Sequence, residues 1–283
     1  MLTPFDRLCC NLLLLSAEAL ETSLREFVRG FENVIVAFSG GVDSSYLSFV
    51  CHQELGAQAH CVTALSPSVS SRQEDLARTF AKRHQLNWTT ISTQEMEDLN
   101  YTSNPTQRCY FCKQELYQRL DGLRHEWGID IVMDGTNKDD LGDFRPGLRA
   151  VRELDVVSPL SLLGFGKEDI RDRSRHWGLQ SAELPAMPCL SSRFPYGTEI
   201  TARKLKQVEQ AEECLRRLGF NTFRVRHHEE LARIEIDQGE LTRALDEDIL
   251  SEIRQGLLSV GYRYVTLDLS GFQSGSLNRS HDE

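Results

Sequence analysis

The sequence lacks an excess of positive charge and lacks any long apolar run. Its 32 lysines and arginines are outnumbered by 42 aspartates and glutamates, which gives a net charge of −10. A general DNA or RNA binder carries a basic domain or stripe, so this balance argues against a nucleic-acid partner. The longest early apolar run, Leu12 to Leu15, falls far short of the roughly 20 residues of a membrane helix, and Asp6 precedes it where a secretory signal carries positive charge. The sequence therefore predicts a cytoplasmic protein without a membrane partner.

Length and composition place the chain among ordinary globular proteins. With 283 residues, of which 40% are hydrophobic and 26% charged, it is long enough for two domains. We predict a first domain over residues 1–185, a second over 198–270 and a mobile tail over 271–283, which is rich in Ser, Gly and Asn. A Pro-rich stretch from Pro185 to Pro195 connects the two domains.

The two domains differ in their patterns of apolar residues. In the first, predicted strands at 34–38, 60–65, 88–91, 129–133 and a short run at Val156-Val157 alternate with predicted helices, among them 11–30, 71–84, 116–127 and 167–177. This alternation predicts an α/β fold, with a parallel sheet of about five strands and helices on both faces. In the second, helices at 202–217 and 241–255 and strands at 222–226, 232–236 and 262–269 predict a smaller α+β domain.

A glycine-rich loop, Ser39-Gly40-Gly41-Val42-Asp43-Ser44-Ser45, lies between the first predicted strand and the next helix. Paired glycines permit turns that are closed to other residues, and serine hydroxyls together with free helix N-terminal amides attract phosphate. The common nucleotide loop has a lysine for the β and γ phosphates, and this loop has none. Asp43 stands there instead, which is reasonable if Mg²⁺ lies between carboxylate and phosphate. The alternative, a turn that binds nothing, is disfavoured by the strand–loop–helix context.

Further polar residues are expected at the same sheet edge, because ligands of parallel α/β sheets bind beyond the carboxyl ends of the strands. The loops Ser66-Pro67-Ser68 and Asp134-Gly135-Thr136-Asn137 both follow predicted strands. Thr136 and Asn137 can contact ribose or phosphate. Asp139-Asp140 follows, and Arg145 and Arg149 can approach a pyrophosphate, although a single exposed arginine is more often only a surface charge.

Three of the eight cysteines form a pattern that indicates chemistry. Cys109 and Cys112 form a C-x-x-C pair, and Cys189 lies in the segment Pro188-Cys189-Leu190-Ser191-Ser192-Arg193. A reducing cytoplasm disfavours a disulfide framework. Three thiolates suit either zinc with a fourth ligand from elsewhere or a 4Fe-4S cluster with one iron free. Three unrelated buried thiols are the plainer alternative.

The second domain contains a pair of arginines on one predicted strand. Arg224 and Arg226 are two residues apart and therefore face the same side, so together they can clamp a phosphate or carboxylate. Glu212 and Glu235 can supply acid, base or cation-binding groups nearby. A solvated sheet face with ordinary salt bridges explains the same residues equally well.

Four segments, residues 39–45, 134–137, 189–197 and 223–228, together resemble the LarE family of PP-loop ATP pyrophosphatases, and the resemblance spans nearly the whole chain. It implies ATP-dependent sulfur insertion. The carboxylates of pyridinium-3,5-biscarboxylic acid mononucleotide are adenylated, pyrophosphate is released, and thiocarboxylates form for the nickel-pincer nucleotide cofactor. It also implies that Asp43 holds Mg²⁺ and that residues 39–45 bind the pyrophosphate. It further implies that Arg224 and Arg226 grip the phosphate of the substrate, and we expect Arg193, Glu212 and Glu235 to take part in substrate binding with them.

The resemblance leaves two sources for the sulfur. In single-cysteine members, the cysteine matching Cys189 gives up its own sulfur and becomes dehydroalanine. This sequence also has Cys109 and Cys112, as in the three-cysteine form, in which a 4Fe-4S cluster carries an extra sulfide on the iron that no cysteine binds. We expect that form, with a sulfide donor as partner and, by the same resemblance, a homo-oligomer of six chains.

Two other functions compete with this interpretation. A tRNA thiolase of the same superfamily can also use three cysteines and a cluster, but tRNA binding should bring a basic surface, and this chain is acidic. An ammonia-dependent enzyme of the superfamily has no need of the cysteines. Outside enzymes, the loop can sense ATP while the cysteines hold structural zinc, with a histidine such as His84, His125 or His176 as fourth ligand.

Overall fold

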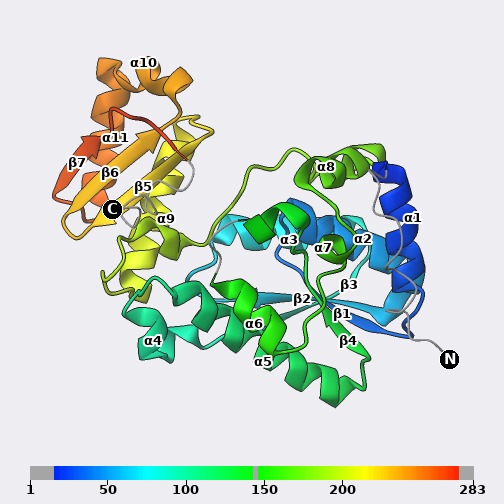
Figure 1. Cartoon of the computed structure of the whole chain (residues 1–283). Helices are drawn as coiled ribbons and strands as arrows, with labels where there is room; N and C mark the ends of the chain where they lie inside the picture. The colour runs from blue at the N-terminus through cyan, green and yellow to red at the C-terminus, as the bar shows by residue number, and fades with distance from the viewer. Residues whose placement is uncertain (1–15, 143–145, 274–283) are drawn as a thin grey trace. The chain divides into compact units, whose positions relative to one another are not determined.

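The computed structural model describes residues 16–142 and 146–273 (Figure 1). Cys9, Cys10, Arg145 and the last ten residues of the predicted tail lie outside these ranges. The chain divides into two compact units, of which the first comprises Met1–Glu95 and Gln107–Met187 and the second Met96–Thr106 and Pro188–Glu283. The assignment of residues 96–106 to the second unit was not predicted. Within the described ranges, no helix has both the length and the apolar character needed to cross a membrane.

Four parallel strands form the sheet of the first unit, in the order β3-β2-β1-β4. They are β1 (Val34–Ala37), β2 (Ala59–Leu65), β3 (Asn87–Ser92) and β4 (Ile131–Met133). The expected fifth strand is reduced to one parallel bridge between Val157 and Met133, because helix α7 begins at Pro159 and leaves no length for a ladder. The predicted class, a parallel α/β fold, is confirmed.

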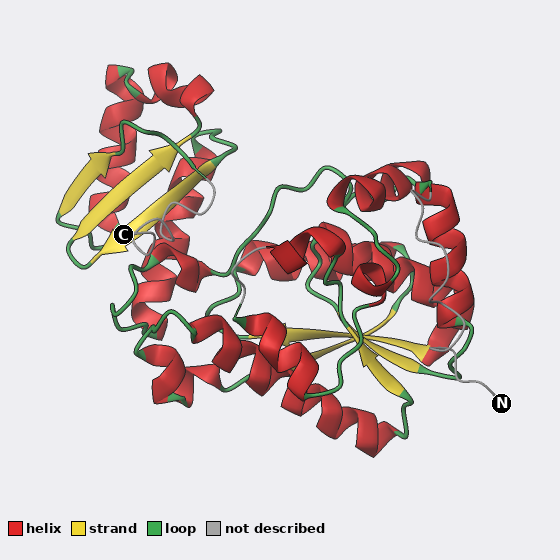
Figure 2. Cartoon of the chain, in the orientation of Figure 1, coloured by secondary structure: helices red, strands yellow, loops and turns green. Residues whose placement is uncertain are grey.

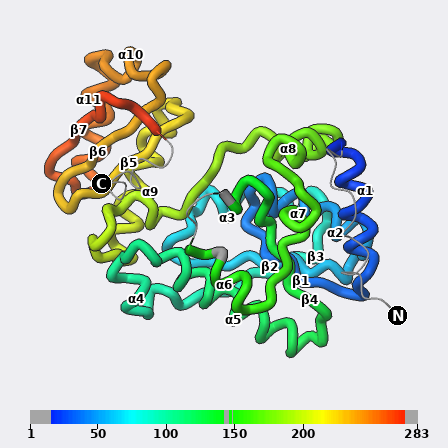
Figure 3. Tube along the Cα trace, in the orientation of Figure 1, coloured from blue at the N-terminus to red at the C-terminus, as the bar shows by residue number. Residues whose placement is uncertain are grey.

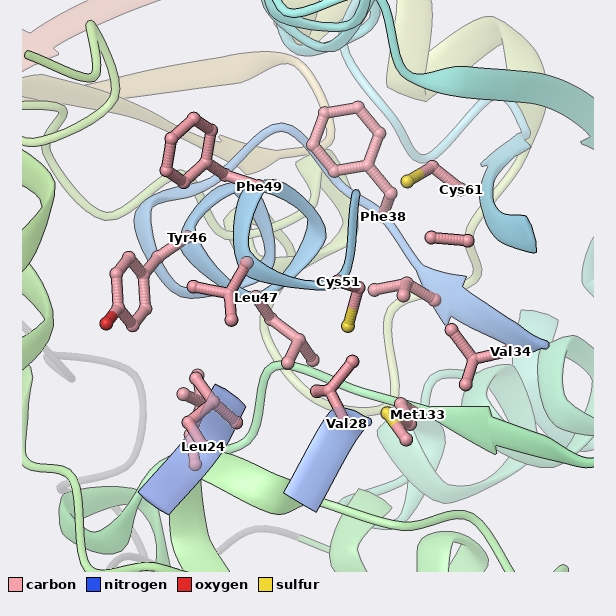
Figure 4. Packing of buried hydrophobic residues seen from close by; sticks show 14 of the residues in the cluster. Leu24, Val28, Val34, Phe38, Tyr46, Leu47, Phe49, Cys51, Cys61 and Met133 are labelled. Atoms are coloured by element: carbon pink, nitrogen blue, oxygen red, sulfur yellow. The ribbon is translucent and has the colours of Figure 1, made fainter. Parts of the chain in front are cut away.

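Helices cover both faces of this sheet (Figure 2). One face is packed by α1 (Ala17–Val28), α2 (Val42–Leu55), α3 (Ser71–Arg83), α7 (Pro159–Leu162) and α8 (Lys167–His176), and the other by α5 (Arg108–Trp127) and α6 (Gly147–Glu153). In the core under the first set, Cys51 and Cys61 are fully buried among Val34, Leu47 and Met133 (Figure 4). These two cysteines are therefore small core residues, as cysteines in apolar patterns often are.

The second unit is an α+β module, as predicted. Its sheet has the order β5-β6-β7, with β5 and β6 antiparallel and β6 and β7 parallel. Its elements are α4 (Leu99–Thr102), α9 (Ala202–Arg217), β5 (Phe223–His228), β6 (Leu231–Ile236), α10 (Leu241–Ala244), α11 (Glu247–Ser259) and β7 (Tyr264–Leu267). The single helix predicted over 241–255 is two helices, because the Asp246 carboxylate caps α11 by accepting from the N–H groups of Asp248 and Ile249.

The segment that contains α4 is bound to the chain that precedes α9 (Figure 3). The buried hydroxyls of Tyr101 and Ser191 lie 2.6 Å apart, and the Asn104 side chain donates to Pro195 O at 2.7 Å. Two backbone bonds, from Gly197 N to Asn104 O and from Ile200 N to Thr102 O, add to this connection. The loop that carries Cys189 is thereby fastened from a distant part of the sequence.

Candidate functional site

The glycine-rich loop leaves β1 and turns into α2. Gly40 has a φ of +76°, and Gly41 is the N-cap residue of α2, with no side chain to occupy the free N–H groups of the first turn. The hydroxyls of Ser39 and Ser44 lie 3.0 Å apart, and Ser44 Oγ also accepts from Ser39 N at 3.2 Å. The loop thus gathers two hydroxyls at a helix N-terminus whose amides have no cap, an arrangement suited to an anion.

The Asp134–Asn137 loop lies directly against this helix N-terminus. A Cβ on Gly135 would come within 2.8 Å of Ser44 N and 3.1 Å of the Asp43 carbonyl carbon, so only glycine allows this approach. Thr136 and Asn137 are buried. The structure therefore brings the two predicted nucleotide-binding loops together at the carboxyl ends of β1 and β4.

Two carboxylates lie close together beside the loop. Burial, and next the negative charge of Asp140, raise the pKa of Asp43 to about 6, while Lys167, Asn137 and Arg171 act in the opposite direction. The Lys167 ammonium lies 3.5 Å from Asp140 Oδ1. The buried side-chain NH₂ of Asn137 lies near Asp43. Among the described residues, no acceptor has the geometry of a hydrogen bond with it.

A divalent cation reduces the repulsion between two neighbouring carboxylates. Mg²⁺ in particular prefers one or two carboxylates together with phosphate oxygens as ligands. The donor set of Asp43 and Asp140 therefore fits Mg²⁺. Neither Asp140 nor Lys167 had been assigned a role from the sequence. The sequence signal that could have identified Asp140 was the Asp139-Asp140 pair, which follows soon after the Asp134–Asn137 loop.

A buried carboxylate organises the second loop. Asp134 accepts hydrogen bonds from the hydroxyls of Tyr117 at 2.7 Å, Thr136 at 2.8 Å and Ser158 at 2.6 Å. Burial alone would raise the pKa of Asp134, but the nearby Lys113 ammonium and these hydrogen bonds lower it. Asp134 therefore stays ionised and fixes the position of the Gly135-Thr136 turn.

The C-x-x-C pair lies in the first turn of α5. The predicted helix began at Leu116, whereas the observed one begins at Arg108, so Cys109 and Cys112 are one helical turn apart on a single helix. Cys109 is exposed and Cys112 half-buried. Within the described ranges, no three or more histidine, cysteine, aspartate or glutamate side chains gather as a metal site. The spacing of the pair suits two thiolate ligands of one centre, and Cys189, the third thiol, belongs to the second unit.

Arg193 holds the Cys189 loop in the second unit. The guanidinium donates twice to Glu212, at 2.8 and 2.9 Å, and also to the carbonyl oxygens of Pro188 and Cys189. Both charged side chains are buried. Because every guanidinium nitrogen already has a protein acceptor, Arg193 and Glu212 form a support for Cys189.

The arginine pair on β5 forms a second charged cluster. Arg226 donates to Ser192 O at 2.9 Å and to Glu235 Oε2 at 2.7 Å, and Arg224 donates to Phe223 O at 2.7 Å. Burial, and next the positive charge of Arg193, lower the pKa of Arg224 to about 10. In the first unit, Arg149 lies 3.7 Å from the centre of the Tyr110 ring and 3.2 Å from Glu153.

The fold and the loop define a class, that of α/β domains with an ATP-using PP-loop. Consistent with this class, a family model described as NAD synthase matches residues 16–120, a range that runs from before α1 into α5.

Three relatives match the chain over nearly all of its length. It is 36% identical to the pyridinium-3,5-bisthiocarboxylic acid mononucleotide synthase of Lactiplantibacillus plantarum, over 89% of this chain and 91% of the relative. It is 44% identical to an uncharacterised protein of Synechocystis sp., over 91% and 96%, and 31% identical to one of Methanocaldococcus jannaschii, over 90% and 96%. The chain belongs to the LarE family of PP-loop enzymes and is an ATP-dependent sulfurtransferase.

Proposed function

We propose that this chain converts the carboxylates of pyridinium-3,5-biscarboxylic acid mononucleotide into thiocarboxylates, with cleavage of ATP to AMP and pyrophosphate, as a step toward the nickel-pincer nucleotide cofactor. One observation carries the proposal: a synthase with the bisthiocarboxylic product in its name is 36% identical to this chain over 89% of its length. The lysine-free loop with Asp43 at the start of α2 supports the ATP chemistry.

Activation is the task of the first unit. A substrate carboxylate oxygen attacks the α-phosphorus of ATP, the bond to the β-phosphate oxygen breaks, and pyrophosphate leaves with the electron pair. Ser39, Ser44 and the free amides at the start of α2 receive the pyrophosphate. Mg²⁺, when bound by Asp43 and Asp140, would neutralise charge on the leaving group. The substrate then carries AMP as an acyl-adenylate. AMP is a far better leaving group than the oxide that the free carboxylate would have to lose.

Substrate binding is proposed for the second unit. Arg224 and Arg226 would grip the phosphate of the mononucleotide through fork-shaped donors, and their position two residues apart on β5, with the charge of Arg193 nearby, supports this role. Glu235, which accepts from Arg226 and lies 3.1 Å from Arg233, keeps the cluster aligned. For Arg193 and Glu212 we propose support of the Cys189 loop in place of direct contact with substrate.

For the sulfur source we propose a 4Fe-4S cluster bound by Cys109, Cys112 and Cys189. When bound, it would supply a sulfide on the iron that no cysteine ligates, as the nucleophile that displaces AMP. The adjacent thiols in the first turn of α5 support this assignment. Anaerobic reconstitution with iron and sulfide should give about four irons per wild-type chain and clearly fewer in Cys109→Ala, by iron assay and Mössbauer spectroscopy. Absence of iron uptake by the wild type would refute the cluster.

The second candidate source is the thiol of Cys189 itself, with one turnover per chain. Mass spectrometry of the whole chain after turnover separates the two. An intact mass after several product molecules per chain supports the cluster, whereas the loss of one sulfur at Cys189, leaving dehydroalanine, supports the sacrificial route.

Pyrophosphate release tests whether the chain is an enzyme at all, as opposed to an ATP sensor with structural zinc. Wild-type protein with ATP, Mg²⁺ and the pyridinium dicarboxylate should release pyrophosphate, and Asp43→Ala should lose at least about 100-fold in rate, because the metal loses a ligand. Asp75→Ala, on the exposed side of α3, is the matched control and should keep the wild-type rate. A wild type that binds ATP but releases none with this substrate would contradict the proposed reaction.

The proposed partners are a sulfide donor and further copies of this chain, in a hexamer inferred from family resemblance. Sedimentation of the purified protein tests the second point, since a monomer of 32.2 kDa sediments far more slowly than an assembly of six.

A further inference from the structure

The helix with the C-x-x-C pair and the loop that closes the nucleotide site are joined through one buried carboxylate. Lys113 directly follows Cys112 on α5, and its ammonium lies 3.6 Å from Asp134 Oδ2. Tyr117, one turn further along the same helix, donates to that oxygen at 2.7 Å. Two side chains of α5 therefore meet Asp134, which stands at the end of β4.

The Lys113 side chain has two further neighbours besides Asp134. Its ammonium lies 5.5 Å from the centre of the Tyr117 ring. A Cβ on Gly147, the first residue of α6, would come within 2.7 Å of Lys113 Cδ, so the absence of a side chain there leaves room for the lysine stem. The lysine stem thus packs against protein while its charged end reaches Asp134.

On the other side of Asp134, contact continues to the phosphate-binding loop. Asp134 accepts from Thr136 Oγ1 at 2.8 Å and from Thr136 N at 3.2 Å, which fixes the turn through Gly135. Gly135 in that turn lies so close to Ser44 N at the start of α2 that a Cβ on it would have no space. An unbroken path of packed or hydrogen-bonded groups thus runs from the residue after Cys112 to an amide of the nucleotide loop.

We propose that Asp134 is a positioning residue that, through Lys113, couples the Cys109–Cys112 turn to nucleotide binding, an inference that rests on the nucleotide site proposed above. ATP bound at the amides of α2 would restrict the Gly135-Thr136 turn packed against them, and through Asp134 and Lys113 it would restrict the turn that contains the two cysteines. Because coupling of binding equilibria is reciprocal, a ligand on the two thiols changes ATP affinity by the same factor as ATP changes theirs.

Alkylation of the cysteine pair measures this coupling. Metal-free protein is treated with iodoacetamide with and without ATP and Mg²⁺, and modification of the peptide containing Cys109 and Cys112 is followed by mass spectrometry. ATP should change the rate about five-fold or more in the wild type and by less than about two-fold in Asp134→Asn and Lys113→Met. Lys82→Met, an exposed lysine on α3, is the matched control and should respond like the wild type.

ATP binding is measured in parallel by calorimetry, so that loss of coupling is distinguished from loss of binding. If both variants bind ATP and still respond like the wild type, ATP shields the thiols directly and the coupling is refuted. A wild type that binds ATP without a response refutes the coupling alone, whereas a wild type that binds no ATP refutes the nucleotide site as well. Should Asp134→Asn fail to fold, Lys113→Met decides, because its partly exposed side chain is not part of the core.

Discussion

At the scale of single residues, Gly40 shows most clearly how the phosphate loop depends on one side chain being absent. Its φ of +76° lies in the left-handed region, and an added Cβ would come within 2.8 Å of both N and Cα of Ala77 on α3. Backbone atoms cannot rotate out of the way as the end of a side chain can. The loop and α3 must therefore separate if any other residue takes this position.

Gly40→Ala should lower the free energy of unfolding by about 1–3 kcal/mol through the strained φ and the clash with α3. Chemical denaturation measures this. Gly122→Ala is the matched control, because Gly122 lies inside α5 with open space around it, and alanine there should stabilise the protein by about 0.5–1 kcal/mol. Equal effects of the two substitutions would contradict the role given to Gly40.

His227 is a buried imidazole in the second unit. Its ring lies 4.9 Å from that of Phe194, and its Nδ1 lies 3.0 Å from the Tyr262 hydroxyl. Burial lowers the pKa of His227 to about 4 from 6.5. The folded protein thus resists protonation of this ring, whereas the unfolded chain accepts a proton near pH 6.5.

The stability that neutral His227 contributes is therefore complete above pH 6.5 and is lost as the pH falls toward 4. Between pH 7 and pH 5 the loss should be about 2 kcal/mol. Urea unfolding at the two pH values measures this. Between pH 7 and pH 5, His227→Gln should lose about 2 kcal/mol less unfolding free energy than the wild type. His125→Gln, an exposed histidine on α5, should match the wild type at both values. An unchanged pH dependence in His227→Gln would show that other groups cause the loss.

At the scale of elements, the buried pair of Arg193 and Glu212 joins the short η5 helix (Leu190–Arg193), which follows Cys189, to α9. Glu212 also accepts from Val225 N of β5 at 3.2 Å. One carboxylate therefore connects three elements around the Cys189 loop. Loss of the arginine would leave that carboxylate buried without its cation, whereas loss of both charges would not.

Arg193→Met should consequently cost about 3–5 kcal/mol of unfolding free energy, and Arg193→Met with Glu212→Leu should cost less than the single change. Denaturation of the two singles and the double gives the coupling energy. Lys204→Met, which removes a partly exposed ion pair with Glu229, should cost under about 1 kcal/mol. Additive costs for Arg193 and Glu212 would show that the pair does not act as one unit.

The elements were largely predictable from the sequence because strands and helices follow from local patterns. Apolar runs located β1 and β2, and the pattern over 202–217 gave the bounds of α9. The start of α5 was missed by eight residues, since Arg108 and Cys109 add no amphipathic signal. The repulsion between Asp43 and Asp140 and the ion pair of Lys113 with Asp134 could not be predicted, because both depend on how loops and helices meet in space.

At the scale of the whole molecule, the net charge of −10 leads us to expect weak affinity for tRNA. Neutralisation of phosphates by basic residues supplies most non-specific affinity for nucleic acid. At an ionic strength of about 0.15 M, filter binding with total tRNA should therefore show no retention at micromolar protein. Retention that weakens steeply with added salt would instead favour a tRNA substrate.

The second unit contains residues 96–106, whose binding partners follow residue 187. A ribosome synthesises this segment about 80 residues before the chain that packs against it, a delay of roughly 4–16 s at the usual rates of elongation. During that interval Tyr101 and Asn104 have emerged while Ser191 and Pro195 do not yet exist. The second unit therefore cannot complete its folding before residues 188–200 have been synthesised, and we expect nascent chains arrested before residue 188 to leave residues 96–106 open to protease.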